Sequence, residues 1–275
     1  MAIIKNPLTI VQTGGGTLPN YGSITYLDAN DVEQTLTLAT EADYMELTLG
    51  GSGSDITING VTVNKNKITG ATIADGVNYI PGGFCQGCNY LTTATIPSSV
   101  HYIGYQAFAY CDITNGSFSL DNVIRVEDSF LTGNSHFNSP ISLTRVREIG
   151  SSFLYSCTSF NSSITINDNC EYIGGAFLRN CISFAQSLSL PSGINPALSS
   201  PGDRFMQECR SFTGPLVCNC PAAQMTSSSN VLSTTDSTAL LYTTGVTLTG
   251  PYAQAWKDRF PDRDSSPYRK LIVGS

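Results

Sequence analysis

Apolar residues recur through the middle of this chain in a nine-residue segment that begins with an aliphatic residue and ends with cysteine. Residues 149–157 read IGSSFLYSC, and residues 173–181 repeat the segment as IGGAFLRNC. The last residues of successive copies are 23, 23, 23, 24 and 28 positions apart, and a period held this closely indicates a repeat architecture. We call the segment the signature and number its positions one to nine. Its six copies are residues 80–88, 103–111, 126–134, 149–157, 173–181 and 201–209.

Short apolar patterns surround each signature. Seven and nine residues after its end, apolar residues alternate with polar ones, as at Ile141 and Leu143. This alternation has the period of a strand with one buried face. An apolar residue also stands three positions after the end, except in the second copy, where Thr114 occupies that place. One copy cannot bury its own apolar side, so the copies are expected to stack into a solenoid.

At this point the chain resembles the BspA-type leucine-rich repeat proteins, whose unit has roughly 23 residues. Residues 96–111 (IPSSVHYIGYQAFAYC) and 166–181 (INDNCEYIGGAFLRNC) carry the likeness, which extends over about residues 56–220. The resemblance implies a β-rich α/β solenoid of the leucine-rich-repeat type with about six rungs. Such repeats are scaffolds whose surfaces vary, so the resemblance implies no particular ligand.

The two ends of the chain do not follow the repeat. Residues 1–54 contain four short apolar segments, at 8–11, 23–26, 34–38 and 44–49, which we interpret as strands of a small β module. This module is either a cap on the first rung or a docking arm. Residues 55–220 form the predicted solenoid, beginning with a hairpin at 56–63. Residues 221–275 form a C-terminal cap, with strands at 240–242, 246–248 and 271–273 and a helix at 251–260 that buries Trp256.

Composition excludes several function classes. The formal net charge is −7 and no cluster of lysine and arginine exists, which argues against nucleic-acid binding. No apolar run approaches the roughly 20 residues that a membrane helix needs, so membrane insertion is not expected. The opening MAIIKNPLTIVQTGGG has no apolar core of signal-peptide length, and we therefore expect no export through such a signal.

Cysteine placement suggests a structural role. Of nine cysteines, five occupy signature position nine, and free cysteine packs as a small buried hydrophobe. We therefore predict a reduced, buried column. Cys85 and Cys88 look like half of a zinc site, but Cys218 and Cys220 have poor spacing for the other half, so we expect no metal and no cofactor. The predicted column consists of Cys88, Cys111, Cys157, Cys181 and Cys209.

The sequence gives little evidence for a set of catalytic residues. The histidines, His101 and His136, stand at non-equivalent repeat positions, and a nucleophilic site would need one of them oriented against serine or cysteine. Glu148 and Glu171 fall in adjacent rungs and could form a glycoside-hydrolase acid pair, but nearby arginines suggest surface ion pairs instead. We therefore predict no catalytic residue, and a glycan hydrolase is the less favoured alternative.

A surface remains as the predicted functional feature. The two residues between the apolar pair that leads into each signature should stack, rung on rung, into an exposed ribbon rich in tyrosine and arginine. Simple packing of tyrosine on its neighbours is the competing interpretation. The predicted binding residues are Tyr79, His101, Tyr102, Arg125, Arg147, Glu148 and Tyr172.

From these features we expect a non-enzymatic recognition or structural protein. One hypothesis is a tailed-phage virion protein, tail- or fibre-associated. It would contact other virion proteins through residues 1–54, form a homo-oligomer in the assembly, and bind a protein or glycan of the host surface through the solenoid. Its location would be the virion, assembled in the host cytoplasm. The alternative is a BspA-like adhesin on a bacterial cell surface.

Overall fold

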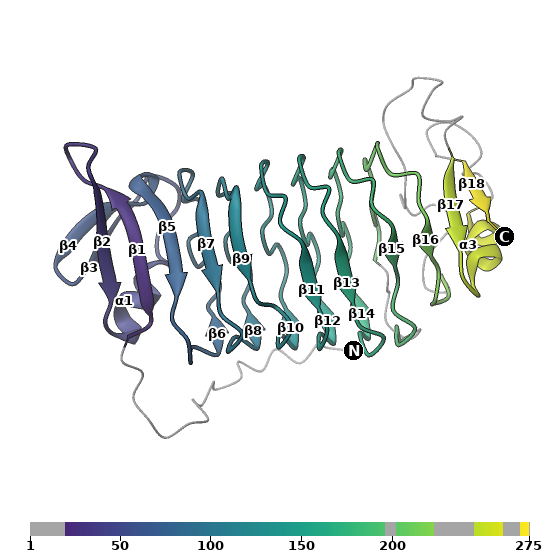
Figure 1. Cartoon of the computed structure of the whole chain (residues 1–275), viewed down its shortest axis with the longest axis horizontal. Coiled ribbons are helices and arrows are strands. Elements are labelled where there is room, and N and C mark those ends of the chain that lie inside the picture. Colours follow the sequence, from purple (N-terminus) through teal and green to yellow (C-terminus); the bar gives the residue numbers. More distant parts are fainter. Residues whose placement is uncertain (1–19, 196–201, 223–244, 261–269, 275) are drawn as a thin grey trace.

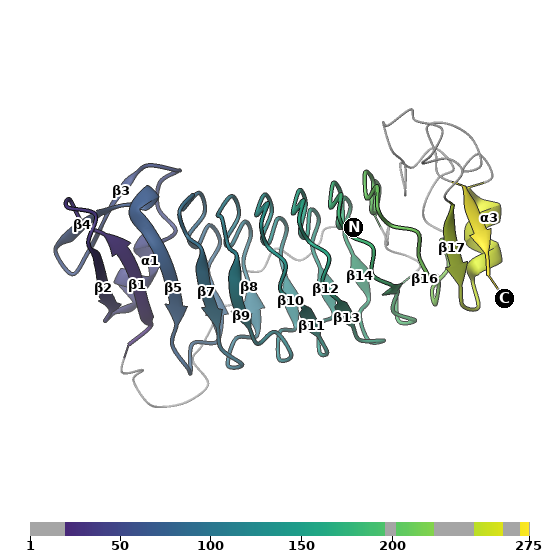
Figure 2. The same ribbon diagram turned by 45° about the horizontal axis from the view of Figure 1, so that its top comes forward.

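The computed structural model of the chain describes residues 20–195, 202–222, 245–260 and 270–274. The molecule is an elongated stack of turns, with short strands side by side along its length and a different arrangement of elements at each end (Figures 1 and 2). The predicted solenoid of about 23 residues per turn is thereby confirmed. Over residues 68–173, each turn contributes one strand to each of two columns.

The shorter column is continuous and parallel. Its strands have two residues each and correspond to the apolar-pair segments that lead into the signatures. Their register follows the 23-residue spacing, so that Tyr79 pairs with Tyr102 and Ile80 with Ile103. The inward isoleucine or valine is buried in every rung. The strands are β6 (Tyr79–Ile80), β8 (Tyr102–Ile103), β10 (Arg125–Val126), β12 (Glu148–Ile149) and β14 (Tyr172–Ile173).

The longer column is divided among three sheets. The first ends at β9, and its register reveals an irregular copy, because Thr93 pairs with Asn115, only 22 residues later. Ile113 is fully buried in this copy and Thr114 is exposed. The segment between Cys111 and β9 is therefore one residue shorter than its counterparts, and Ile113 is the buried residue in place of Thr114. We call this copy the short copy. The strands are β5 (Ile68–Ile73), β7 (Thr93–Ile96) and β9 (Asn115–Phe118), then β11 (Ile141–Leu143) and β13 (Ile164–Ile166), then β15 (Leu188–Ser189), β16 (Leu216–Val217), β17 (Val246–Thr249) and β18 (Leu271–Val273).

The signature folds into a turn with an unusual alternation of backbone conformation. Positions four, six and eight have positive φ in all six copies, for example Ser152 (59°), Leu154 (55°) and Ser156 (61°). Left-handed backbone costs a non-glycine residue roughly 1–2 kcal/mol. Hydrogen bonds between copies offset this cost: the Leu154 N–H donates backwards to Phe130 O at 3.1 Å, and the Ser152 N–H donates forwards to Gly175 O at 2.8 Å.

Aromatic rings form the centre of the stack. Phe153 stacks on Phe177 with a centroid separation of 5.4 Å, and Phe177 on Phe205 at the same distance. A second row of parallel rings is formed by the phenylalanines three positions after the last four signatures: Phe137, Phe160, Phe184 and Phe212. In the short copy the signature carries Ala107 at position five, and Phe118 fills the gap by stacking on both Phe108 and Phe137.

The N-terminal end continues the first sheet. Strand β1 (Gly22–Leu27) pairs with both β2 (Glu33–Leu38) and β5, and the hairpin β3 (Asp55–Ile58)–β4 (Val61–Asn64) precedes the 3-10 helix η1 (Lys65–Lys67). The expected strand at residues 44–49 was wrong, because α1 (Glu41–Glu46) lies there. Thr40 and Asp43 form a capping box at its start, and Tyr44 and Leu47 are buried on one helical face. Residues 8–11 lie outside the described residues.

The C-terminal end closes the stack with β17, β18 and α3 (Ala253–Arg259). Pro251 precedes the helix instead of lying in its first turn as expected, and Tyr252 is the N-cap residue. Trp256 is fully buried, as expected, and its Nε1–H donates to Cys220 O at 2.7 Å. The strand expected at residues 240–242 lies outside the described residues. The division of the chain at residues 54 and 220 stays a prediction, although β1 shares a sheet with the first repeats.

Candidate functional site

The predicted ribbon exists as a ladder along the short strand column. Tyr102 pairs with Arg125, Arg125 with Glu148, and Glu148 with Tyr172. The residues just before them form a parallel row, because the backbone N–H of each donates to the carbonyl of its counterpart one rung earlier, as Arg147 does to Ile124 at 2.8 Å. His101, Arg147 and Glu148 are exposed, whereas Tyr79, Tyr102, Arg125 and Tyr172 are half-buried.

Ion pairs link the centre of the ribbon across rungs. Arg125 Nε lies 3.3 Å from Glu148 Oε2, and Arg147 Nη1 lies 3.3 Å from Glu171 Oε1. Both pairs lie at the protein surface, where ion pairs contribute at most about 1 kcal/mol to stability. Their effect is to orient the side chains, so the centre of the ribbon presents paired cationic donors and anionic acceptors.

Carboxylates hold the tyrosines of the ribbon. The Tyr79 hydroxyl donates to Glu41 Oε1 at 2.6 Å, and Tyr102 is bonded to Glu127. Burial, followed by the bond to the carboxylate, raises the pKa of both phenols above the ordinary value. For Tyr172, burial and then the charge of Asp128 raise the pKa. All three rings therefore stay neutral over the physiological pH range.

The surface of the ribbon, which includes Ile124, extends to the neighbouring Tyr105 and Glu127. Tyr105 is 50% exposed and Ile124 is 41% exposed. The Tyr105 N–H donates to Glu127 Oε2 at 3.1 Å, which places Tyr105 against the same carboxylate that holds Tyr102. Tyr105 and Glu127 belong to the signature and not to the paired positions, so reasoning from stacked pairs missed them. An exposed tyrosine at a signature position filled elsewhere by small or acidic residues is the signal that could have revealed it.

Within the part of the chain that the structure describes, His136 does not form a Ser–His–Asp unit, and Glu148 and Glu171 lie in surface ion pairs. His136 Nδ1 contacts Asp112 and lies 3.4 Å from Ser135 Oγ, so both neighbours compete for one ring nitrogen. A Ser–His–Asp unit needs them on opposite nitrogens. Glu148 and Glu171 are exposed and each lies beside an arginine, in the surface ion pairs that the sequence suggested.

The cysteines of position nine form a buried column. Each thiol after the first donates to the position-six carbonyl of the preceding copy, as Cys157 Sγ does to Leu131 O at 3.2 Å and Cys181 Sγ to Leu154 O at 3.1 Å. Burial raises the pKa of these two thiols well above the ordinary value. All nine cysteines are buried and free, which gives the column a packing role.

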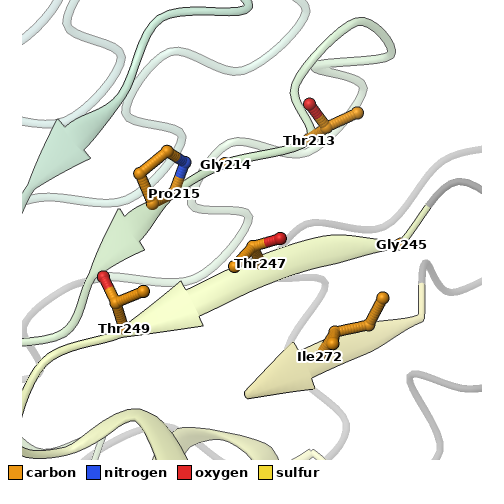
Figure 3. Close-up of a pocket in the computed structure, with 7 residues that line it drawn as sticks. All are labelled: Thr213, Gly214, Pro215, Gly245, Thr247, Thr249 and Ile272. Carbon is orange, nitrogen blue, oxygen red and sulfur yellow. The ribbon is translucent and has the colours of Figure 1, made fainter. Parts of the chain in front are cut away.

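The rest of the described surface offers fewer groups that could bind a ligand. Within the described ranges, no three His, Cys, Asp or Glu side chains are grouped to hold a metal ion, and no helix is long and apolar enough to cross a bilayer. A shallow hollow lies over β16, β17 and β18 (Figure 3). Its lining contains no ionisable or aromatic side chain: Thr213, Gly214, Pro215, Gly245, Thr247, Thr249 and Ile272.

Comparison with known proteins identifies the repeat. The family model of the BspA type leucine rich repeat region matches residues 57–197 in six copies, which is more than half of the chain. This chain belongs to that family. Its sixth signature lies beyond the match, yet Arg204, Met206 and Glu208 have the same positive φ as their counterparts. The BspA-type fold therefore extends further towards the C-terminus. No curated protein matches the chain.

Proposed function

We propose that this BspA-type protein is a non-enzymatic recognition module that binds a protein or glycan of a cell surface through the ribbon. The observation that carries the proposal is the register of Tyr79, Tyr102, Arg125, Glu148 and Tyr172 on one column. Tyrosine and arginine supply contact area and hydrogen bonds at modest entropy cost, and here carboxylates already fix them.

The second part of the proposal concerns the surface that displays the module, which is either a bacterial cell or a virion. A BspA-type repeat suits adhesion or recognition on a bacterial surface, and a solenoid displayed from a virion would use the same ribbon. The comparisons add nothing in favour of the virion. We therefore place the recognition role first and treat residues 1–54 as the part to test for docking to an assembly.

A printed array of bacterial and animal-cell surface glycans tests the glycan arm of the proposal, and binding to whole bacterial and animal cells tests the protein arm. One variant combines Tyr102→Ala, Arg125→Ala and Glu148→Ala, which removes a ring and both members of an ion pair. The matched control combines Thr95→Ala, Ser117→Ala and Thr165→Ala, all on the long column. We expect about tenfold weaker binding for the ribbon variant and unchanged binding for the control. Equal loss in both, or no loss in either, would overturn the ribbon as the binding surface.

A further inference from the structure

The first signature differs from all the others in having cysteine at two inward positions. Cys85 occupies position six and Cys88 position nine, and both are fully buried. In the later copies position six carries a larger apolar residue: Phe108, Leu131, Leu154, Leu178 or Met206. Neither the packing of the column nor recognition through the ribbon requires a second thiol here, so the pair calls for a separate explanation.

The backbone holds the two cysteines at the ends of one tight turn. The Cys88 N–H donates to Cys85 O at 3.2 Å, which closes a four-residue turn through Gln86 and Gly87. The ends of such a turn have Cα atoms less than about 7 Å apart, and disulfides join Cα atoms at about 4.4–6.8 Å. Both side chains are buried in the interior of the stack, and interaction between the two thiols shifts the pKa of each.

A buried ammonium group lies beside this turn. Lys65 is fully buried, and its Nζ donates to Leu47 O at 3.4 Å, Leu49 O at 3.2 Å and Gly50 O at 3.4 Å. Interaction with the Cys85 thiol and the charge of Lys65 lower the pKa of Cys88 against the opposing effect of burial. Burial raises the pKa of Cys85 well above its ordinary value. Cys88 is therefore the thiol of the pair that ionises first.

A short segment covers the pair. The Cys85 N–H donates to Leu47 O at 3.0 Å, and a Cβ added to Gly87 would lie 3.0 Å from the Ser52 N. Residues 47–54 include three glycines, and residues 49–53 are exposed. Segments with few buried apolar contacts open locally at small cost in free energy. Opening of residues 47–54 would admit a small reagent to the sulfurs while the rest of the solenoid stays closed.

We propose that Cys85 and Cys88 are an oxidisable dithiol, in which Cys88 attacks a low-molecular-weight disulfide and Cys85 then closes an intrachain disulfide. In the first step the Cys88 thiolate bonds to one sulfur of RSSR, whose S–S bond breaks and releases RS⁻. In the second step Cys85 loses its proton to solvent and attacks the Cys88 sulfur, which releases the second RS⁻. The protein loses two hydrogen atoms and the reagent becomes two RSH.

Treatment of the reduced, folded full-length protein with 2-hydroxyethyl disulfide tests the proposal, with intact-mass and peptide analysis over time. The wild-type chain should first lose two hydrogen atoms in the peptide that contains Cys85 and Cys88. Cys85→Ser should accumulate the hydroxyethylthio adduct on Cys88 about tenfold faster than on any other cysteine, and Cys88→Ser should gain no comparable adduct on Cys85. Circular dichroism confirms that each variant is folded.

The matched control is Leu154→Cys, which places the same C-x-x-C turn before Cys157 in the middle of the solenoid, away from Lys65 and residues 47–54. We expect this pair to oxidise at least about tenfold more slowly than the first pair. Equal rates, a first modification at another cysteine, or a wild-type chain that forms no disulfide until it unfolds would each overturn the proposal.

Discussion

The Asn134 side chain donates a hydrogen bond of 2.7 Å to the carbonyl oxygen of Phe108, taking the place of the thiol that other copies use. Its Nδ2 also donates to Leu131 O at 2.9 Å, and its Oδ1 accepts from the Ile113 N–H at 3.2 Å. Elsewhere the apolar residue three positions after the signature donates its N–H to the last residue of the signature, as Phe160 does to Cys157 O. The short copy makes no such turn for Ile113, so asparagine supplies the missing acceptor.

We therefore expect the exchange of Asn134 and cysteine to be unfavourable. Asn134→Cys keeps a donor for Phe108 O but leaves the buried Ile113 N–H without its acceptor, which should lower the free energy of unfolding by about 1–2 kcal/mol. Asn134→Leu removes all three bonds and should cost about 2–4 kcal/mol. Urea unfolding gives both values. The reciprocal variant Cys157→Asn is the control. It should also lower the free energy of unfolding, because the Phe160 N–H already donates to the residue-157 carbonyl and leaves the buried asparagine oxygen without this donor. An Asn134→Cys variant as stable as wild type would contradict the explanation.

Glycine at signature position two allows neighbouring copies to approach closely. A Cβ on Gly150 would lie 2.5 Å from the Asp128 N and 2.5 Å from the Glu127 C, both backbone atoms that cannot move aside. Gly150→Ala should therefore lower the free energy of unfolding by about 1–3 kcal/mol. Gly51→Ala is the control, because a Cβ there meets no atom within 4 Å. Equal urea midpoints for the two variants would show that the rungs can separate at no cost.

The spacing of the signatures predicted the ribbon because equal spacing places equal positions side by side. Tyr102, Arg125 and Glu148 lie in register for this reason alone. The same rule did not identify Ile113 as a buried residue, since a fixed offset cannot detect that the segment before β9 is one residue shorter. At residues 44–49 the apolar pattern predicted a strand, whereas the Thr40–Asp43 capping box starts a helix there.

Contacts made only after stacking were not predictable. Most residues at positions four, six and eight are not glycine, so the sequence gives little sign of their positive φ. The compensating hydrogen bonds join different copies and exist only in the assembled stack. The meeting of Tyr105 with Glu127 depends on the same path of the chain, which explains why the candidate surface was predicted in part.

Strain at these positions should be removable. Ser152 has φ of 59°, and its side chain makes no hydrogen bond in the described structure. Ser152→Gly should raise the free energy of unfolding by about 1 kcal/mol, because glycine adopts the left-handed region without steric cost. Ser159→Gly, at an exposed residue without positive φ, should lower it slightly by adding freedom to the unfolded chain. Thermal melting distinguishes the two; a lower melting temperature for Ser152→Gly would contradict the assignment of strain.

Thiol titration tests the buried column. All nine cysteines are buried and free, so a bulky charged disulfide reagent should find few reactive thiols in the native protein at pH 8. After denaturation the count should approach nine. The difference arises because native packing excludes the reagent. A denatured count near zero or one would mean that the cysteines are paired in disulfides, which would contradict the reduced column.

Alkaline pH should unfold the protein through these same thiols. Burial raises the pKa of Cys170 and of Cys220 to about 12, and burial also raises the pKa of Cys157 and Cys181. In the unfolded chain a thiol ionises near pH 8.5, so the folded state holds more protons above that pH. The stabilisation is complete below about pH 8.5 and is lost as pH rises towards the folded pKa, by up to about 1.4 kcal/mol per pH unit for each thiol. Urea unfolding between pH 7.5 and 10.5 under reducing conditions should show stability falling steeply above pH 9. Cys157→Ala should make the free energy of unfolding depend less steeply on pH, because one buried thiol no longer contributes. A free energy of unfolding that does not change with pH in the wild type would contradict the burial of neutral thiols.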